Sequence, residues 1–235
     1  MIQIIDTGYS SADANMKRDA ELLESLHPDG KPLLHLYEWQ SLSVTYGHFI
    51  KPEEYFNLEM MKHNNLSAAK RPTGGGIIFH MWDYAFSFLM PANHKYFSQN
   101  TLENYRFVHE IVIQALIKTF SDKAYNLLPQ DPKAVGDEGN FCMAKPTIFD
   151  VMWEDKKIVG AAQRRKKQGY LHQGSISLQM PDPVFLKKVL REDKKNVVEA
   201  MLLNTYPLTQ DKDISTTRNR LKENLKKEFI CRFKE

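Results

Sequence analysis

The sequence predicts an α+β domain in which mixed or antiparallel sheets are flanked by helices. Segments with strand-like and helix-like patterns follow one another without the regular alternation that is typical of a doubly wound parallel sheet. The 235 residues contain no internal repeat and no low-complexity linker, and this length is ample for a buried core. We therefore expect residues 1–235 to form a single domain, with a charged helical segment over about 183–235.

Alternation and turn residues divide the first ninety residues into elements. Residues 33–39 alternate apolar and polar side chains for most of their length, which indicates a strand. Ser10 or Ser11 can cap a helix over 12–25, and this helix ends before the turn residues of 27–30. The other elements expected here are strands over 3–7, 43–46, 68–71, 76–80 and 84–90 and a helix over 52–63.

The remainder of the chain begins with its longest expected helix, residues 102–120. Residues 131–140 are polar and loop-like. Residues 149–153 and 157–161 predict a hairpin about a turn at 154–156, and residues 174–178 predict one more strand. From Pro183 onward the pattern is helical and highly charged, and the last helix is expected over about 215–229. The helical period of 102–120 rests on Val108, Ile111, Val112, Ala115, Leu116 and Phe120.

Composition excludes several classes of function. A net charge of +3 is too small to argue for nucleic-acid binding, and no segment reaches the ~18 apolar residues that a membrane span needs. The N-terminus lacks the basic and apolar regions of a signal peptide. The two cysteines, Cys142 and Cys231, make no disulfide framework, and no His/Cys cluster indicates a metal site. We expect a cytoplasmic protein that binds no metal, nucleic acid or membrane.

Three consecutive glycines, Gly74 to Gly76, form the most informative motif. Glycine is weak inside strands and helices, so a triplet favours the close approach of a ligand to the backbone. Successive N–H groups can cradle a carboxylate or phosphate, and Arg71 adds a guanidinium that matches such anions. The alternative is a flexible hairpin turn. Arg71 before the triplet, and Phe79 and His80 after it, favour the binding site.

A second candidate group surrounds Lys157. This lysine opens a short apolar strand that continues into the small residues Gly160, Ala161 and Ala162, which allow another group to come close to the backbone. Its ammonium could therefore neutralise a phosphate or carboxylate. The alternative is a solvated lysine at a hairpin turn.

Three further features each have two interpretations. Cys142 is either a small buried hydrophobe or a nucleophile. His172 is either an acid/base group or a hydrogen-bonded structural residue. The basic run 164–167 is either a solvated turn or a docking patch for acidic proteins. Cys231, at the end of a charged helix, is interpreted as structural.

Taken together, these segments resemble the superfamily of lipoate–protein ligases, octanoyltransferases and biotin–protein ligases. Residues 6–8, followed by Asn15-Met16 and 21–23, are similar to its N-terminal strand and helix. Residues 71–80 are similar to its Arg-X-X-Gly-Gly-Gly loop with a downstream His, and 157–163 are similar to its lysine strand. The resemblance extends from about residue 1 to 200. It implies the biotin/lipoate-ligase catalytic-domain fold and a role in protein lipoylation.

In the ligase version, the resemblance implies transfer of lipoate or octanoate to a lysine of a lipoyl domain. The acceptors would be E2 subunits of 2-oxoacid dehydrogenases or the glycine-cleavage H protein. ATP and lipoate would form lipoyl-adenylate with Mg²⁺ shielding the phosphates, no cofactor would be tightly bound, and Lys157 would stabilise the developing charge. The residues implied to bind lipoate or lipoyl-AMP are Arg71, Thr73, Gly74, Gly75, Gly76, Phe79, His80, Gly160, Ala161, Ala162, His172 and Gly174.

In the transferase version, octanoyl moves without ATP from acyl carrier protein to Cys142 and then to the acceptor lysine. The fifteen-residue separation of Cys142 and Lys157 matches one cysteine-dependent branch of the family, in which Lys157 would aid thiolate formation or acyl transfer. That branch usually replaces the third glycine and reads Gln-His before Gly-Ser, whereas this chain keeps Gly76 and reads His172-Gln173. We favour the ligase, because the glycine triplet bears directly on holding an adenylate. A non-catalytic lipoyl-domain binder and a biotin ligase are minor alternatives.

Overall fold

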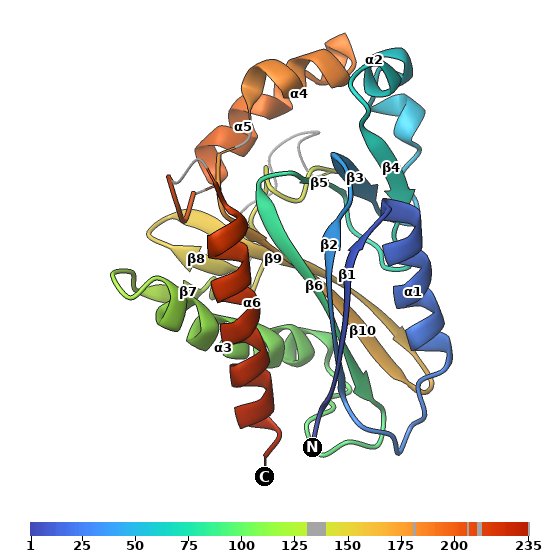
Figure 1. Cartoon of the computed structure of the whole chain (residues 1–235), viewed down its shortest axis with the longest axis vertical. Coiled ribbons are helices and arrows are strands. Elements are labelled where there is room, and N and C mark those ends of the chain that lie inside the picture. Colours follow the sequence, from blue (N-terminus) through green and yellow to red (C-terminus); the bar gives the residue numbers. More distant parts are fainter. Residues whose placement is uncertain (131–139, 181, 206, 211–212, 235) are drawn as a thin grey trace.

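The computed structural model is described for residues 1–130, 140–180, 182–205, 207–210 and 213–234. It has the predicted α+β architecture, with a seven-stranded sheet, a three-stranded sheet and flanking helices (Figure 1). The loop expected at 131–140 lies outside the described residues except for Asn140. Within the described ranges, every helix is too short or too polar to cross a bilayer.

The large sheet is mixed, as predicted. Its first two strands, β1 and β2, are parallel, and every other neighbouring pair is antiparallel. In spatial order the strands are β1 (Gln3–Ser10), β2 (Leu33–Trp39), β6 (Asp83–Pro91), β10 (Gly169–Ser177), β9 (Lys156–Lys166), β8 (Val151–Trp153) and β7 (Tyr125–Leu127).

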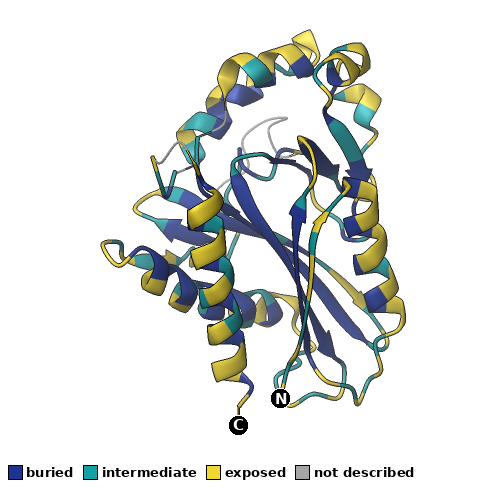
Figure 2. Cartoon of the chain, viewed as in Figure 1, coloured by how far each residue is buried: buried dark blue, intermediate teal, exposed yellow. Residues whose placement is uncertain are grey.

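Helices cover both faces of the large sheet (Figure 1). Helix α1 (Ala12–Glu24) packs on one face, while α3 (Thr101–Thr119) and α6 (Ser215–Arg232) pack together on the other. The strands between them are mostly buried, and the outer helix surfaces are exposed (Figure 2). In α6, Leu221, Leu225 and Phe229 recur every four residues and are fully buried against this sheet, because that spacing places them on one helical face.

The small sheet has the order β4 (Ser67–Lys70), β3 (Ser43–Tyr46) and β5 (Ile77–His80). Strand β3 is parallel to β4 and antiparallel to β5. Apolar residues of this sheet form a second core cluster with α4 (Pro183–Val189) and α5 (Val197–Asn204). The described helices of the C-terminal segment serve both sheets: α4 and α5 cover the small one and α6 covers the large one.

Several elements differ from expectation. The helix expected over 52–63 is broken into a 3₁₀ turn (Pro52–Glu54) and α2 (Leu58–His63), because Phe56 pairs with Leu190 and Asn57 caps α2. The Asn57 side chain accepts a hydrogen bond from Met60 N at 3.1 Å. Strands β9 and β10 extend well beyond 157–161 and 174–178, and β7 was not expected. A second 3₁₀ turn follows α4 (Glu192–Lys194).

Candidate functional site

The glycine loop, residues 71–76, crosses the end of β3. Its flanking strands β4 and β5 do not pair with each other, because each lies against a different edge of β3. A β-carbon at Gly47, just after β3, would lie 1.9 Å from the carbonyl oxygen of Gly75, so the loop passes directly over that residue. The Gly47 N–H donates to Gly76 O at 3.2 Å. The hairpin interpretation of the glycine triplet is therefore wrong.

Arg71 fixes the glycine loop through hydrogen bonds to loop carbonyls and to Thr45. Its Nη1 donates to Thr45 O and Oγ1 at 3.1 and 2.9 Å, and its Nη2 donates to Gly74 O and Gly76 O at 3.1 and 2.7 Å. The side chain is buried, and burial lowers the pKa of Arg71. Only its Nε has no hydrogen-bond partner among the described residues. The terminal N–H groups of Arg71 are thus used to shape the loop, and they do not form an open fork.

The three glycines have different surroundings. A β-carbon at Gly74 would meet nothing within 4 Å, whereas one at Gly76 would lie 2.1 Å from Asn140 O. Gly75 is exposed and has a φ of +82°, which favours glycine. The third glycine is therefore required by the chain segment that packs against it.

That segment brings Cys142 to the glycine loop. Cys142 N donates to Ile77 O at 3.1 Å, and Gly76 N donates to Cys142 Sγ at 3.3 Å. A β-carbon at Gly75 would lie 3.7 Å from this Sγ and 3.4 Å from the β-carbon of Ala162. The half-buried thiol of Cys142, the glycine loop and strand β9 therefore meet at one place.

Lys157 supports Cys142 from the other side. The residue is 2% exposed, and its Nζ donates to Cys142 O at 2.7 Å and to Lys145 O at 3.3 Å. It also forms a buried ion pair with Asp150 Oδ2 at 2.7 Å. A β-carbon at Gly160 would lie 2.4 Å from Lys157 Cε, so the expected small-residue surface under the lysine is present. The solvated-turn interpretation of Lys157 is wrong.

Strands β9 and β10 divide the predicted residues between two faces. Ala162 is paired with Gln173, and both point to the glycine loop, where Thr73 Oγ1 donates to Gln173 Oε1 at 2.6 Å. Neighbouring residues point the other way: Ala161 is paired with Gly174, and a β-carbon at Gly174 would overlap the Phe86 ring. The structure therefore brings Gln173 to the glycine loop and leaves Ala161 and Gly174 on the opposite face.

His172 also lies on that opposite face. It is fully buried, its Nδ1 is 2.9 Å from Gln163 Nε2, and its ring packs against Tyr105 and His109 of α3. Burial lowers the pKa of His172 well below its usual value. A neutral, enclosed imidazole at this place fits the structural alternative stated for His172, because its ring does not reach the glycine loop.

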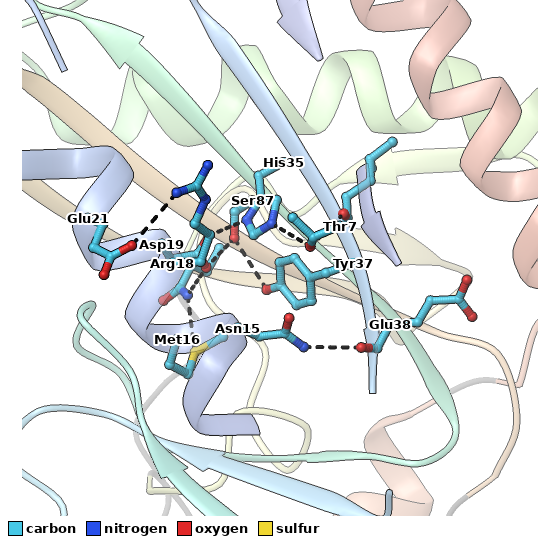
Figure 3. Close-up of polar contacts among 12 residues, drawn as sticks. Thr7, Asn15, Met16, Arg18, Asp19, Glu21, His35, Tyr37, Glu38 and Ser87 are labelled. Carbon is cyan, nitrogen blue, oxygen red and sulfur yellow. Dashed lines mark hydrogen bonds and ion pairs between the residues drawn. The ribbon is translucent and has the colours of Figure 1, made fainter. Parts of the chain in front are cut away.

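Sequence reasoning missed a buried polar network around Asp19 (Figure 3). Asp19 of α1 lies 2.7 Å from His35 Nδ1 through Oδ1, and its Oδ2 accepts from Ser87 Oγ and Gln173 Nε2 at 2.6 Å each. Because Gln173 in turn binds Thr73, this network connects α1 and β2 to the glycine loop. The available signal was the buried stripe of α1, where polar Asn15 and Asp19 lie four residues apart among apolar side chains.

Two of the predicted site residues, Phe79 and His80, belong to β5. His80 lies 2.8 Å from Asp83 Oδ2 through Nδ1 and 2.7 Å from Thr45 Oγ1 through Nε2. Because Thr45 also binds Arg71, His80 supports the loop indirectly. Phe79 belongs to the core under the small sheet.

Three side chains of the basic run 164–167 bind other parts of this chain. Arg164 donates to Pro72 O of the glycine loop at 2.9 Å, Arg165 binds Gln99, and Lys166 pairs with Glu24. Among the described residues, no group of three or more His, Cys, Asp or Glu side chains could hold a metal ion.

The family model described as the lipoyl protein ligase A/B catalytic domain matches residues 11–229. The octanoyltransferase LipM of Anoxybacillus flavithermus is 28% identical over 215 residues, which cover 85% of this chain and 77% of that protein. The LipM of Bacillus subtilis is 28% identical over 186 residues, which cover 77% of this chain and 66% of that protein.

Solved structures of lipoate protein ligases share the fold. A T. acidophilum protein assigned as a lipoate protein ligase, solved with bound lipoic acid, has a TM-score of 0.71 and 25% identity and covers 97% of this chain and 86% of its own. A lipoate-protein ligase A bound with ATP also has a TM-score of 0.71, at 24% identity, and covers 97% and 83%.

Proposed function

The chain belongs to the family of lipoyl protein ligase A/B catalytic domains, whose members act in protein lipoylation, and from that membership we propose that it is an ATP-independent octanoyltransferase. The proposal assigns the acyl-carrying nucleophile to Cys142. One observation carries it: the thiol of Cys142 lies at the glycine loop and accepts a hydrogen bond from Gly76 N–H. The curated relatives named octanoyltransferases support the same assignment.

The ATP-dependent ligase, favoured by the sequence, has less support. That interpretation relied on Gly76 as part of an adenylate cradle, but the backbone of Asn140 occupies the space where a side chain at position 76 would lie. It also relied on Arg71 and Lys157 to bind phosphate oxygens. The terminal donors of Arg71 and the ammonium of Lys157 are already bound to chain carbonyls, Thr45 and Asp150.

The proposed reaction has two acyl transfers. In the first, the Cys142 thiolate attacks the carbonyl carbon of an octanoyl thioester; a new C–S bond forms, the bond to the donor sulfur breaks, and the donor thiolate takes up a proton. In the second, the neutral amine of the acceptor lysine attacks the same carbonyl carbon. The amide bond forms, the bond to Cys142 Sγ breaks, and the proton lost by the amine returns the thiol to its starting state.

The proposed partners follow from this chemistry. The donor is octanoyl-acyl carrier protein, and the acceptor is a lysine on the lipoyl domain of an E2 subunit or on the glycine-cleavage H protein. The glycine loop holds the acyl carbonyl beside Sγ, because Gly75 is exposed there and carries no side chain.

Intact-mass measurement tests the proposal. The purified protein is mixed with octanoyl-acyl carrier protein without ATP, and its own mass is recorded before and after addition of an apo lipoyl domain. We expect an octanoyl adduct on the wild type and on the matched control Cys231→Ala, no adduct on Cys142→Ala, and transfer of the adduct to the lipoyl domain.

Two other outcomes would reject it. Modification of the lipoyl domain only with lipoate, ATP and Mg²⁺, and unimpaired in Cys142→Ala, would identify an adenylating ligase. The absence of modification under both conditions, with lipoyl-domain binding retained, would identify a non-catalytic binder.

A further inference from the structure

We propose that Arg71 and the Gly76 N–H stabilise the Cys142 thiolate, and that Lys157, paired with Asp150, positions the thiol through the Cys142 carbonyl. The inference rests on the proposed function above, because it concerns the same thiol. It assigns different tasks to the two buried cations near Cys142. Arg71 is the charged group that supports the reacting sulfur, and Lys157 is a positioning residue.

The contacts of Lys157 exclude it as the partner of the sulfur in this arrangement. An ammonium has three N–H donors, and Lys157 Nζ has three acceptors within 3.3 Å: Cys142 O, Lys145 O and Asp150 Oδ2. To point a donor at Sγ, it would have to leave one of these buried acceptors unsatisfied. Its side chain is also confined, because its Cε passes across the open face of Gly160.

The Asp150 carboxylate keeps the lysine in this arrangement. Asp150 Oδ2 also accepts hydrogen bonds from Thr147 N and Oγ1, at 2.7 and 3.0 Å. The pair is almost completely buried, with side-chain exposures of 3% each, so its charges attract strongly. Lys157 therefore fixes the peptide of Cys142, and with it the direction from which Sγ approaches the glycine loop.

Arg71 and Cys142 approach each other across Gly75. A β-carbon at Gly75 would lie 3.3 Å from Arg71 Nη2 and 3.7 Å from Cys142 Sγ, so the guanidinium and the sulfur both border this exposed glycine. The guanidinium is fixed by its bonds to Thr45, Gly74 and Gly76. A fixed, buried cation beside a sulfur, together with an N–H donor, is the environment that favours a thiolate.

The tyrosines near Arg71 and the paired Asp150 and Lys157 add no net charge near the sulfur. Tyr37 faces Arg71 from β2, and Tyr105 faces it from α3. Burial raises the pKa of both phenols, so they are neutral near pH 7. Burial lowers the pKa of Arg71. Asp150 is neutralised by Lys157, and Lys145 contributes its carbonyl to the same lysine.

The test is the pH dependence of thiol alkylation. In a Cys231→Ser background, Cys142 is the one thiol left in the chain, and its rate of reaction with iodoacetamide reports the thiolate fraction. We expect Arg71→Gln to move the midpoint upward by about one pH unit, which is about tenfold less thiolate near neutral pH. Arg71→Lys should recover part of this shift, because it keeps the charge.

The matched variant is Lys157→Gln combined with Asp150→Asn, which removes both charges and leaves no unpaired ion. It should keep the midpoint of alkylation within a few tenths of a pH unit, and it should slow acyl transfer from octanoyl-acyl carrier protein, because the thiol is less well placed. A midpoint that moves upward in this double variant would overturn the inference, and so would an unchanged midpoint in a folded Arg71→Gln variant. If Arg71→Gln does not fold, Arg71→Lys tests the role of Arg71: its midpoint should lie above that of the wild type, and an unchanged midpoint would overturn the inference.

Alkylation requires no acyl donor, so the two proposals can fail separately. A wild-type midpoint that depends on Arg71, with no octanoyl adduct in the mass experiment, would reject the transferase and retain the inference. An octanoyl adduct on Cys142, with an alkylation midpoint that depends on Lys157, would support the transferase and reject the inference.

Discussion

Replacing Gly76 by alanine would test how the glycine loop and Cys142 are joined. A β-carbon at position 76 would lie 2.1 Å from Asn140 O and 2.5 Å from Asn140 C. Both contacts are with backbone, so no side-chain rotation can relieve them. Segment 140–142 would have to move away, and Cys142 would move with it.

The structure indicates the size of the effect. Inserting a methyl group into a tightly packed place costs about 1–3 kcal/mol. Displacing the segment would also weaken the hydrogen bonds from Cys142 N to Ile77 O and from Gly76 N to Cys142 Sγ, at about 1 kcal/mol each. We therefore expect Gly76→Ala to lower the free energy of unfolding by roughly 3–5 kcal/mol and to reduce acylation of Cys142 by more than tenfold.

Gly74→Ala is the matched control, because a β-carbon there meets nothing within 4 Å and its φ is not positive. It should leave stability unchanged or raise it slightly, by up to about 1 kcal/mol. Urea unfolding followed by fluorescence measures both variants, and intact mass after incubation with octanoyl-acyl carrier protein measures acylation. A Gly76→Ala protein as stable and as readily acylated as Gly74→Ala would refute the packing argument.

Further predictions concern buried polar groups. Burial lowers the folded-state pKa of His109 and His172, so the stability that they contribute is complete above the unfolded value of about 6.5 and is lost as pH falls below it. The free energy of unfolding in urea should therefore fall more for the wild type than for His172→Phe between about pH 6.5 and 5. Parallel pH profiles of the two proteins would contradict this. Asp150→Asn leaves the Lys157 ammonium unpaired and should cost about 3–5 kcal/mol in chemical denaturation, whereas a loss under about 1 kcal/mol would mean that the pair is not buried in solution. Gln173→Leu removes the acceptor of Thr73 and a donor to Asp19, so single-turnover acyl transfer should slow about tenfold; an unchanged rate would show that this network does not position the loop.

Much of the fold could be predicted from local patterns in the sequence. The strand over 33–39 and the hairpin about 154–156 are present because alternation and turn residues coincide there. The helix over 52–63 was wrongly expected to be continuous, because the pairing of Phe56 with Leu190 joins residues far apart in the sequence. The full lengths of β9 and β10 were missed because their charged tip, residues 164–167, has the composition of a loop although it continues the hairpin.

The motifs of the site could be predicted from the sequence, but their arrangement in space could not. The glycine loop, Cys142 and Lys157 do lie together, as their residue types suggested. The preference for a ligase rested on the kept third glycine, and nothing in the sequence could show that Asn140 packs against Gly76. The role of Gln173 was equally hidden, because the face to which a strand residue points depends on the register of β10 with β6 and β9.

The alternation along the β9–β10 hairpin limits where the chain can change in length. Strand β10 pairs with β6 along its whole length and with β9 from Gly169 to Ile176. Adding or deleting one residue between His172 and Ser175 would therefore exchange the two faces for part of the strand. A side chain suited to the packed interior would then meet the glycine loop, and Gln173 would be enclosed against α3. Insertions at the two-residue turn 167–168 leave both ladders intact. Natural or engineered length variation in this hairpin should therefore be confined to its tip.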